Sequence, residues 1–240
     1  FEKIGTKVIV ADEEIVRICN DKWETCNFLK KHGFETFYSS IDIDKCIKDI
    51  NEGKVEYPLI IKPRWGMGSI GISIADDEEE LKVLYNKVKK EIARTYLKYE
   101  ADQDLDHSVI IQEYIKGQEY GMDVINDLDT VYQETIVRKK LGMRSGETDC
   151  AQMTDNQTIK AMGEKLAGIT KHIGNFDVDI FEYNGKYYIL EMNARFGGGY
   201  PFSHEAGANL PTAIVAWLEG KKIDKTVFAV KDGMKIQKAI

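Results

Sequence analysis

Three oxygen-bearing side chains on two neighbouring apolar segments have the types and the spacing of a metal site. Asp179 lies within the apolar segment 176–180, and Glu191 and Asn193 lie within the segment 188–193. Because strand side chains alternate between two faces, Glu191 and Asn193 would share a face. Carboxylate and amide oxygens beside a phosphate are ligands that Mg²⁺ prefers. The spacing therefore predicts a magnesium site, and a solvent-facing polar stripe is the alternative interpretation.

A glycine-rich segment, Gly66-x-Gly68-x-x-Gly71, has the composition of a phosphate-binding loop. The pattern is weak by itself, because dinucleotide sites and kinase loops share it. A dinucleotide site needs a helix directly after the glycines, whereas the strand-like segment 72–75 follows here. A Walker A loop would end in Gly-Lys-Ser/Thr, which is absent. The order strand, loop, strand predicts a hairpin whose backbone N–H groups approach phosphate oxygens closely, because the glycines lack Cβ atoms.

Two cationic side chains accompany these motifs. Lys62 stands just before the glycine loop, where a buried lysine without a partner would be costly and a polyphosphate would supply the partner. A lysine that extends its charged end to solvent is the alternative for Lys62. Arg195 is followed by Phe196 and three glycines, and this composition indicates a loop shaped around an anion.

The elements that must position these residues form a mixed α+β order. We expect helices over 12–32 in two pieces, 42–52, 77 into the 90s, 156–173 and 210–219. We expect strands over 57–63, 72–75, 108–114, 119–126, 130–138, 176–182 and 186–192. Asn184-Gly185 between the last two strands is a strong hairpin signal, and this hairpin would bring Asp179 near Glu191.

Composition limits the function classes. The chain has 240 residues, a formal charge of -7 and a charged fraction of 30%, which is ordinary for a soluble globular protein. No apolar run approaches the roughly 20 residues that span a bilayer, and no basic face points to nucleic acid. The four cysteines have neither CxxC nor zinc spacing, so we expect a cytoplasmic protein.

Three motifs, in order, resemble the ATP-grasp superfamily. They are Lys62-Pro63-x-x-Gly66-x-Gly68-Ser69-x-Gly71, Gln112-Glu113-Tyr114-Ile115-x-Gly117-x-Glu119 and Leu190-Glu191-Met192-Asn193-x-Arg195. Within that superfamily the chain is most similar to the synthetase units of the carbamoyl-phosphate synthetase large chain and to small carboxylate–amine ligases. The resemblance runs from about Phe1 to about Gly220, and the order and spacing of the motifs make it specific.

The resemblance implies an α+β fold of the ATP-grasp type, with two α+β lobes that grip the nucleotide between them. It implies a remnant or linker over 1–20, a small lobe with the glycine loop over 21–112, and a large lobe with the metal-binding hairpin over 113–240. The chain starts Phe1-Glu2-Lys3 with no signal peptide pattern, and we expect that the family's N-terminal domain is missing.

The resemblance also implies a nucleotide-binding set. Lys22 and Lys62 would contact phosphates, and the glycine loop with Ser69 would cover them. Gln112 would accept from the adenine amino group through its carbonyl. Glu119 would hold the ribose hydroxyls. The segment that carries the adenine contacts is Gln112, Glu113, Tyr114 and Ile115.

The catalytic set follows from the same resemblance. Asp179, Glu191 and Asn193 would hold two Mg²⁺ ions, with Mn²⁺ as a substitute ion and Glu191 as the bridging ligand. Arg195 would stabilise the transferring phosphoryl group. Arg138 and Arg144 belong to a basic tract where relatives place an active-site loop, and we interpret them as carboxylate or phosphate contacts. A basic surface turn is the alternative for this tract.

The implied reaction is that of an ATP- and Mg²⁺-dependent ligase. It would phosphorylate a carboxylate to an acyl phosphate, which an amine then attacks, with small molecules as substrates and a homodimer as one expected assembly. Synthesis of carbamoyl phosphate by this chain alone is not expected. Two other hypotheses stay open: a phosphotransferase, although the chain has no His-Arg-Asp and no Asp-Phe-Gly motif, and a nucleotide-binding module without ligase activity.

Overall fold

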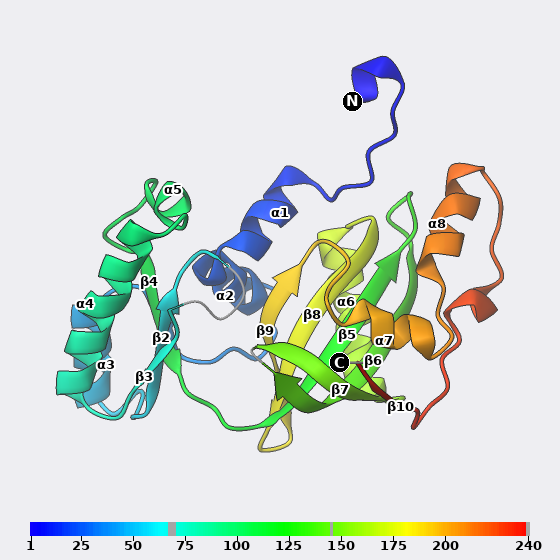
Figure 1. Ribbon diagram of the computed structural model, residues 1–240. Coiled ribbons are helices and arrows are strands. Elements are labelled where there is room, and N and C mark those ends of the chain that lie inside the picture. Colours follow the sequence, from blue (N-terminus) through cyan, green and yellow to red (C-terminus); the bar gives the residue numbers. More distant parts are fainter. Residues whose placement is uncertain (67–70, 145, 239–240) are drawn as a thin grey trace. The chain divides into compact units, whose positions relative to one another are not determined.

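The computed structural model describes residues 1–66, 71–144 and 146–238, and the chain divides into two compact units (Figure 1). One unit is Asn20–Gly117, and the other combines Phe1–Cys19 with Gln118–Ile240. This division differs from the expected boundaries, because the segment 113–117 belongs to the first unit and the N-terminal segment belongs to the second.

The unit Asn20–Gly117 is built on a four-stranded antiparallel sheet in the order β1-β4-β2-β3. Its elements are α2 (Lys22–Lys31), β1 (Ser39–Ser40), α3 (Ile43–Asn51), β2 (Leu59–Pro63), β3 (Ser73–Ala75), α4 (Glu78–Arg94), α5 (Lys98–Ala101) and β4 (Val109–Glu113). The carboxylates of Asp21, Asp42 and Asp77 accept from N–H groups in the first turns of α2, α3 and α4. These N-caps explain why the three helices start where the sequence predicts.

The two faces of this sheet differ in chemistry. Leu59 and Ile61 of β2 are fully buried in a hydrophobic core that also contains Leu81 and Val88 of α4. Because strand side chains alternate, Lys62 of β2 points to the opposite face. The apolar face anchors β2 against α4, and the polar face presents Lys62 directly before the glycine-rich segment.

The second unit is built on a six-stranded antiparallel sheet in the order β10-β7-β6-β5-β8-β9. Its elements are a short 3-10 helix (Glu2–Ile4), α1 (Glu13–Asn20, which ends at the junction of the units), β5 (Gln118–Asn126), β6 (Tyr132–Arg144), β7 (Glu147–Met153), α6 (Gln157–Thr170), β8 (Gly174–Tyr183), β9 (Lys186–Asn193), α7 (Tyr200–Glu205), α8 (Leu210–Leu218), a second 3-10 helix (Lys225–Phe228) and β10 (Lys235–Gln237).

Different helices cover the two faces of this sheet (Figure 1). Helix α6 packs closely on one face, where a Cβ on Gly163 would lie 2.3 Å from Oγ1 of Thr135. On the other face, Ile125 and Ile136 share a hydrophobic cluster with residues of α7 and α8. Arg138 and Lys140 of β6 stand on the same face as Ile136, so the apolar cluster fixes the strand that carries them.

One expected loop is regular structure. The basic tract from Arg138 to Thr148 was expected to form a loop or a surface turn, but most of it belongs to β6 and β7. The two strands pair with register shifts around Gly142. The strand expected over 130–138 therefore extends to Arg144, and the sequence patterns also missed α5, α7 and β10.

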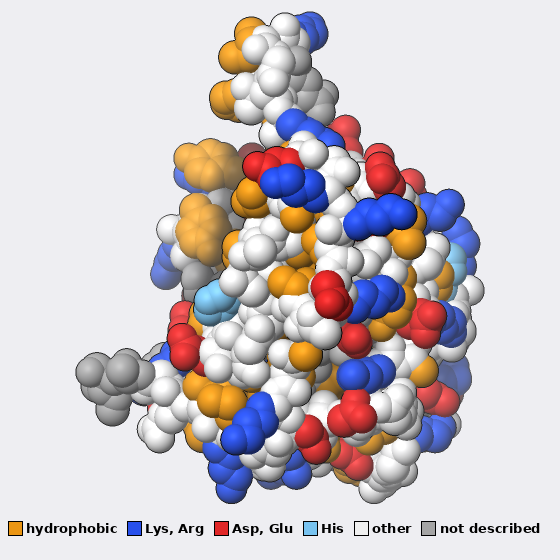
Figure 2. All heavy atoms as spheres, turned by 90° about the vertical axis from the view of Figure 1, so that its right-hand side faces the viewer, with side chains coloured by type: hydrophobic (Ala, Val, Ile, Leu, Met, Phe, Trp, Pro, Cys, Tyr) orange, Lys and Arg blue, Asp and Glu red, His pale blue; other side chains and the backbone are white. Residues whose placement is uncertain are grey.

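Charged side chains are distributed over the surface. Figure 2 shows Lys and Arg side chains interspersed with Asp and Glu side chains on one face, as expected from 33 basic and 40 acidic residues. Within the part of the chain that the structure describes, no helix is long and apolar enough to cross a membrane.

Candidate active site

The base of the glycine-rich segment is held by a buried ion pair. Nε and Nη2 of Arg64 donate to the carboxylate of Asp21, with the shortest contact at 2.7 Å between Nη2 and Oδ2. Burial opposes the charge of Arg64, but Asp21 and Asp104 outweigh this effect and raise the pKa of the guanidinium. Asp21 also caps α2, so the pair fixes Lys22, whose Nζ donates to the carbonyl of Gly66 at 2.6 Å.

Two glycines of the segment occupy positions that a residue with a Cβ would not easily adopt. Gly66 has φ +98°, and a Cβ there would lie 2.4 Å from Cδ2 of Leu97. Gly71 has φ +69°, a conformation that other residues rarely adopt. The expected nucleotide contacts Gly68 and Ser69 lie outside the described residues.

Lys62 and Gln112 lie on the polar face of the four-stranded sheet. Their side chains are buried, and they stand on the paired strands β2 and β4. Nε2 of Gln112 donates to Oγ of Ser39 at 2.8 Å and to Sγ of Cys26 at 3.3 Å. An adenine amino group donates hydrogen bonds, so within Gln112 only the carbonyl oxygen could accept from it, while the amide nitrogen donates within the protein.

The last residue of β4 and the residue that follows it both have their backbone N–H groups engaged. The N–H of Glu113 donates to the carbonyl of Tyr38 at 3.1 Å, and the N–H of Tyr114 donates to the carbonyl of Pro58 at 3.3 Å. The backbone of both residues could therefore serve adenine only through carbonyl oxygens. Ile115 follows with a half-buried side chain.

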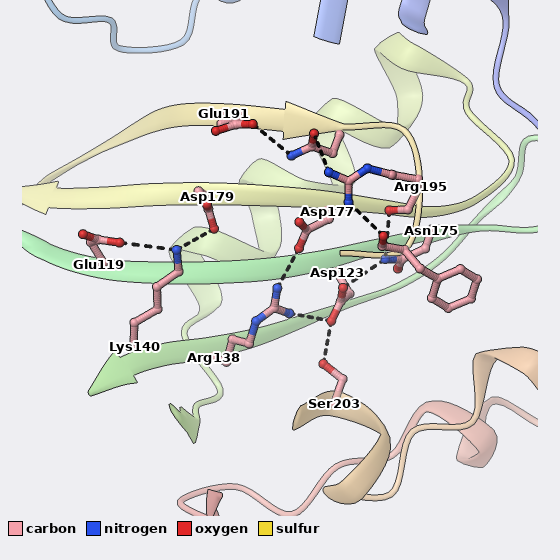
Figure 3. Close-up of polar contacts among 12 residues, drawn as sticks. Glu119, Asp123, Arg138, Lys140, Asn175, Asp177, Asp179, Glu191, Arg195 and Ser203 are labelled. Atoms are coloured by element: carbon pink, nitrogen blue, oxygen red, sulfur yellow. Dashed lines mark hydrogen bonds and ion pairs between the residues drawn. The ribbon is translucent and has the colours of Figure 1, made fainter. Parts of the chain in front are cut away.

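In the second unit, the hairpin of β8 and β9 brings together the expected metal ligands (Figure 3). Asp179 pairs in register with Glu191, so these side chains share a face, as the sequence predicts. Nδ2 of Asn193 lies 3.5 Å from Oε1 of Glu191. In residues 1–66, 71–144 and 146–238, no group of three His, Cys, Asp or Glu side chains could hold a metal ion. The third donor of a site here would be the amide of Asn193, and this oxygen set fits Mg²⁺.

Lys140 connects two expected site residues. Its Nζ lies 2.7 Å from Oδ1 of Asp179 and 3.3 Å from Oε2 of Glu119. The Lys140 side chain is only 6% exposed, whereas Asp179 and Glu119 are 30% and 31% exposed. The acid expected to hold ribose and the acid expected to hold metal therefore share one ammonium group, a link that the sequence patterns did not indicate.

Arg138 is not available to a substrate, so its interpretation as a substrate contact was wrong. The side chain is 1% exposed, and its Nη1 and Nη2 donate to Asp123 at 2.5 Å and to Asp177 at 2.7 Å. Asp123 also accepts from Oγ of Ser203 at 2.6 Å. Burial is the main cause that raises the pKa of Asp177 to about 6, and Arg138 opposes it. Arg138 is therefore paired with buried carboxylates, whereas Lys140 is paired with carboxylates that reach solvent.

The glycines after Arg195 fit around protein side chains. A Cβ on Gly197 would lie 2.0 Å from Cγ of Asp177, and a Cβ on Gly199 would lie 2.1 Å from Nη2 of Arg138. The loop is therefore shaped around the carboxylate of Asp177, which pairs with Arg138. Sequence spacing could not reveal this, because Arg138 comes from a distant strand.

The two remaining expected catalytic arginines are exposed. Nη2 of Arg195 donates to Oδ1 of Asn193 at 3.2 Å, so Arg195 lies beside the expected metal ligands. Arg144 pairs with Asp149 at 2.7 Å within the hairpin of β6 and β7. Both arginines thus contact a residue nearby in the sequence and expose their side chains to solvent.

Comparison with protein families gives one match over most of the chain. A model of the ATP-grasp domain matches residues 19–199. The carbamoyl phosphate synthase large chain of Pseudothermotoga lettingae is 24% identical over 241 aligned residues that cover 94% of this chain and 20% of the relative. The large chain of Pyrococcus furiosus is 26% identical, with 88% of this chain and 19% of the relative covered. The chain thus spans about a fifth of the length of these curated relatives.

Solved structures share the fold. A biotin carboxylase complex from Campylobacter jejuni superposes with a TM-score of 0.76 at 18% identity, covering 98% of this chain and 53% of that chain. The biotin carboxylase domain of 2-oxoglutarate carboxylase from Hydrogenobacter thermophilus, a dimer in complex with MgADP, ADP and bicarbonate, gives 0.75 at 19% identity, covering 92% and 50%.

Proposed function

We propose that this chain, which belongs to the ATP-grasp domain family, is the catalytic core of an ATP- and Mg²⁺-dependent ligase. The observation that carries this proposal is the in-register pairing of Asp179 with Glu191, with the amide of Asn193 beside them. In the proposed reaction a carboxylate oxygen attacks the γ-phosphorus of ATP, and ADP leaves. An amine then attacks the carbonyl carbon of the acyl phosphate, so that a C–N bond forms while phosphate and a proton are released. The curated relatives are carbamoyl phosphate synthase large chains, which supports this reaction class.

The proposed nucleotide contacts are the residues that the family resemblance implies. Lys22 and Lys62 would neutralise phosphate oxygens, and the clamp of Arg64 on Asp21 holds Lys22 at the base of the glycine segment. Gln112 would accept from the adenine amino group, and Glu119 would accept from the ribose hydroxyls. Gly66, Gly68, Ser69 and Gly71 would cover the phosphates.

The proposed metal ligands are Asp179, Glu191 and Asn193, with Glu191 shared between two ions. Bound Mg²⁺ would offset the negative charge of the phosphates during transfer, and Mn²⁺ would substitute for it. Arg195 is proposed to stabilise the phosphoryl group as it leaves ATP, because it is exposed and held beside Asn193. Phosphoryl transfer depends mainly on positioning and charge neutralisation, which are what these residues supply.

One arginine is the candidate contact on the acceptor side. Arg144 is exposed at the end of β6 and remains the candidate contact for the substrate carboxylate, whereas Arg138 is withdrawn from this role. The Hydrogenobacter thermophilus structure is a dimer that contains bicarbonate, and we extend a homodimer and a small carboxylate to this chain as proposals.

Calorimetry of ATP-analogue binding, with and without Mg²⁺, tests the proposal. We expect Mg²⁺-dependent binding to the wild-type chain, and we expect Glu191→Ala to remove the Mg²⁺ dependence. Lys62→Ala should weaken binding roughly tenfold to a hundredfold, the range for one charged hydrogen bond to phosphate. Lys90→Met, which removes an exposed lysine of α4, is the matched control and should bind like wild type.

Each outcome separates one function from another. An analogue affinity that is the same with and without Mg²⁺ would contradict the ligase proposal and favour a nucleotide-binding module. ATP turnover in the presence of any phosphate acceptor, without a requirement for an amine, would favour a phosphotransferase.

A further inference from the structure

Two cations stand on the same face of the six-stranded sheet, and their partners divide the acidic residues into two groups (Figure 3). Arg138 is enclosed with Asp123 and Asp177, and the glycines of the loop before α7 pack directly on this group. Lys140, two residues further along β6, is paired with Glu119 and Asp179 instead. The first group is sealed, whereas the acids of the second group reach solvent.

The Lys140 ammonium contacts Asp179, a carboxylate that the proposed function assigns as a ligand of a divalent ion. Its amine is nearly buried and needs anionic partners, because a buried unpaired charge is costly. A divalent cation bound to Asp179 would stand a few ångströms from this ammonium, and the two like charges would repel each other. Lys140 thus partly neutralises the expected metal site before any ion arrives.

We propose that Lys140 is a positioning residue that acts as a built-in counter-ion. It holds the carboxylates of Asp179 and Glu119 in place, and its charge weakens binding of a divalent ion that arrives without nucleotide. The phosphates of a nucleotide add negative charge, which offsets this repulsion, so metal and nucleotide bind together rather than metal alone. This inference rests on the proposed function, because it assigns Asp179 to the metal.

Mn²⁺ binding to the full chain, followed by electron paramagnetic resonance without nucleotide and with ADP, tests this inference. We expect Lys140→Met to bind Mn²⁺ without nucleotide roughly tenfold more tightly than wild type, the order expected when one charge is removed from a half-exposed site. With ADP present, the difference between the two proteins should become smaller. Lys140→Arg keeps the charge and should restore the wild-type affinity.

The chain supplies a matched control beside the test position. Lys139 is the next residue of β6, so its side chain points to the other face of the sheet. Lys139→Met removes the same charge and should leave Mn²⁺ affinity at the wild-type value. Lys140→Gln removes the charge but keeps a donor for Asp179, and it replaces Lys140→Met if circular dichroism shows that the methionine variant does not fold.

The outcomes distinguish this inference from the function on which it rests. If wild type binds Mn²⁺ with ADP but the uncharged variants at position 140 bind Mn²⁺ no more tightly than wild type, the counter-ion inference is overturned alone. If wild type binds no Mn²⁺ even with ADP, the metal assignment and the inference are overturned together. An equal gain in Lys139→Met would also overturn it, because the effect would then come from net charge.

Discussion

Arg138 illustrates how one buried side chain organises its neighbours at the scale of single residues. Its guanidinium lies close to two glycines, since a Cβ on Gly121 would be 2.8 Å from Nε and a Cβ on Gly199 would be 2.1 Å from Nη2. Removing one partner of such a buried pair usually costs several kcal/mol, because the other charge is left unpaired. The absence of a side chain at Gly199 is therefore a packing requirement of the ion pair.

Gly199→Ala tests this packing requirement. We expect the variant to lose about 1–3 kcal/mol of unfolding free energy, because the added methyl group must displace the buried guanidinium. Urea unfolding followed by circular dichroism measures the loss. Gly198→Ala is the control, since a Cβ at Gly198 meets nothing within 4 Å. Equal stability of the two variants would show that the loop yields without cost.

The neighbours that sequence reasoning paired, and those it missed, differ in how far apart the two residues lie in the chain. Asp179 and Glu191 are joined by a short hairpin, so alternation and one turn signal were enough to pair them. Lys140 meets Asp179 only because β5 lies between β6 and β8 in the sheet. Strand order across a sheet is a tertiary property, and no local pattern in the sequence specifies it.

At the scale of elements, the junction between α6 and β8 carries a buried histidine. The ring of His172 is 1% exposed, stacks on Phe176, and lies 2.8 Å from Oγ1 of Thr170 and 3.1 Å from the carbonyl of Val124. A carbonyl oxygen can only accept, so the contact with Val124 places a proton on Nε2 of His172. Burial lowers the pKa of His172 to about 4 from an ordinary value of 6.5.

This shift predicts an acid sensitivity with a defined window. The folded state favours the neutral ring, so the stability from His172 is present above pH 6.5 and is lost as pH falls toward 4. The expected loss across this window is about 3 kcal/mol. We expect His172→Gln to be less stable than wild type at pH 7 and to have a flatter profile between pH 6.5 and 4. Urea unfolding at several pH values measures both, and parallel profiles would contradict the assignment.

Element boundaries followed the sequence where caps and turns are local. Asn184 and Gly185 have φ of 51° and 73°, as a two-residue hairpin turn with both central residues at positive φ requires. Helix α6 ends earlier than expected, because Lys171 adopts φ 45° at the C-cap and ends the helix before Gly174. The strand β7 was missed because its sequence, Glu147–Met153, is mostly polar and lacks an apolar alternation.

At the scale of the whole molecule, each unit has its own hydrophobic core. The core of Asn20–Gly117 is formed by buried residues of its own strands and helices, among them Leu59 and Leu81. A continuous segment that buries its own core meets the main requirement for folding alone.

We therefore predict that a fragment of residues 20–117 folds without the rest of the chain. It should unfold in urea in one cooperative transition that circular dichroism can follow. Leu81→Ala in the same fragment should lower the unfolding free energy by about 2–5 kcal/mol, because Leu81 is fully buried. A gradual change of signal without a midpoint would show that this core depends on the remainder of the protein.

The second unit is discontinuous in sequence, and this has a consequence for the order of events during synthesis. Cys19, next to the last residue of α1, is half-buried with its thiol beside the backbone of Ala194, and this desolvation raises the pKa of the thiol to about 12. A ribosome that makes the chain from its N-terminus completes the segment 20–117 long before it reaches Ala194. Helix α1 is thus among the first elements to be synthesised, whereas the segment around Ala194 is synthesised much later. Helix α1 therefore reaches its folded position only after the intervening segment has been made.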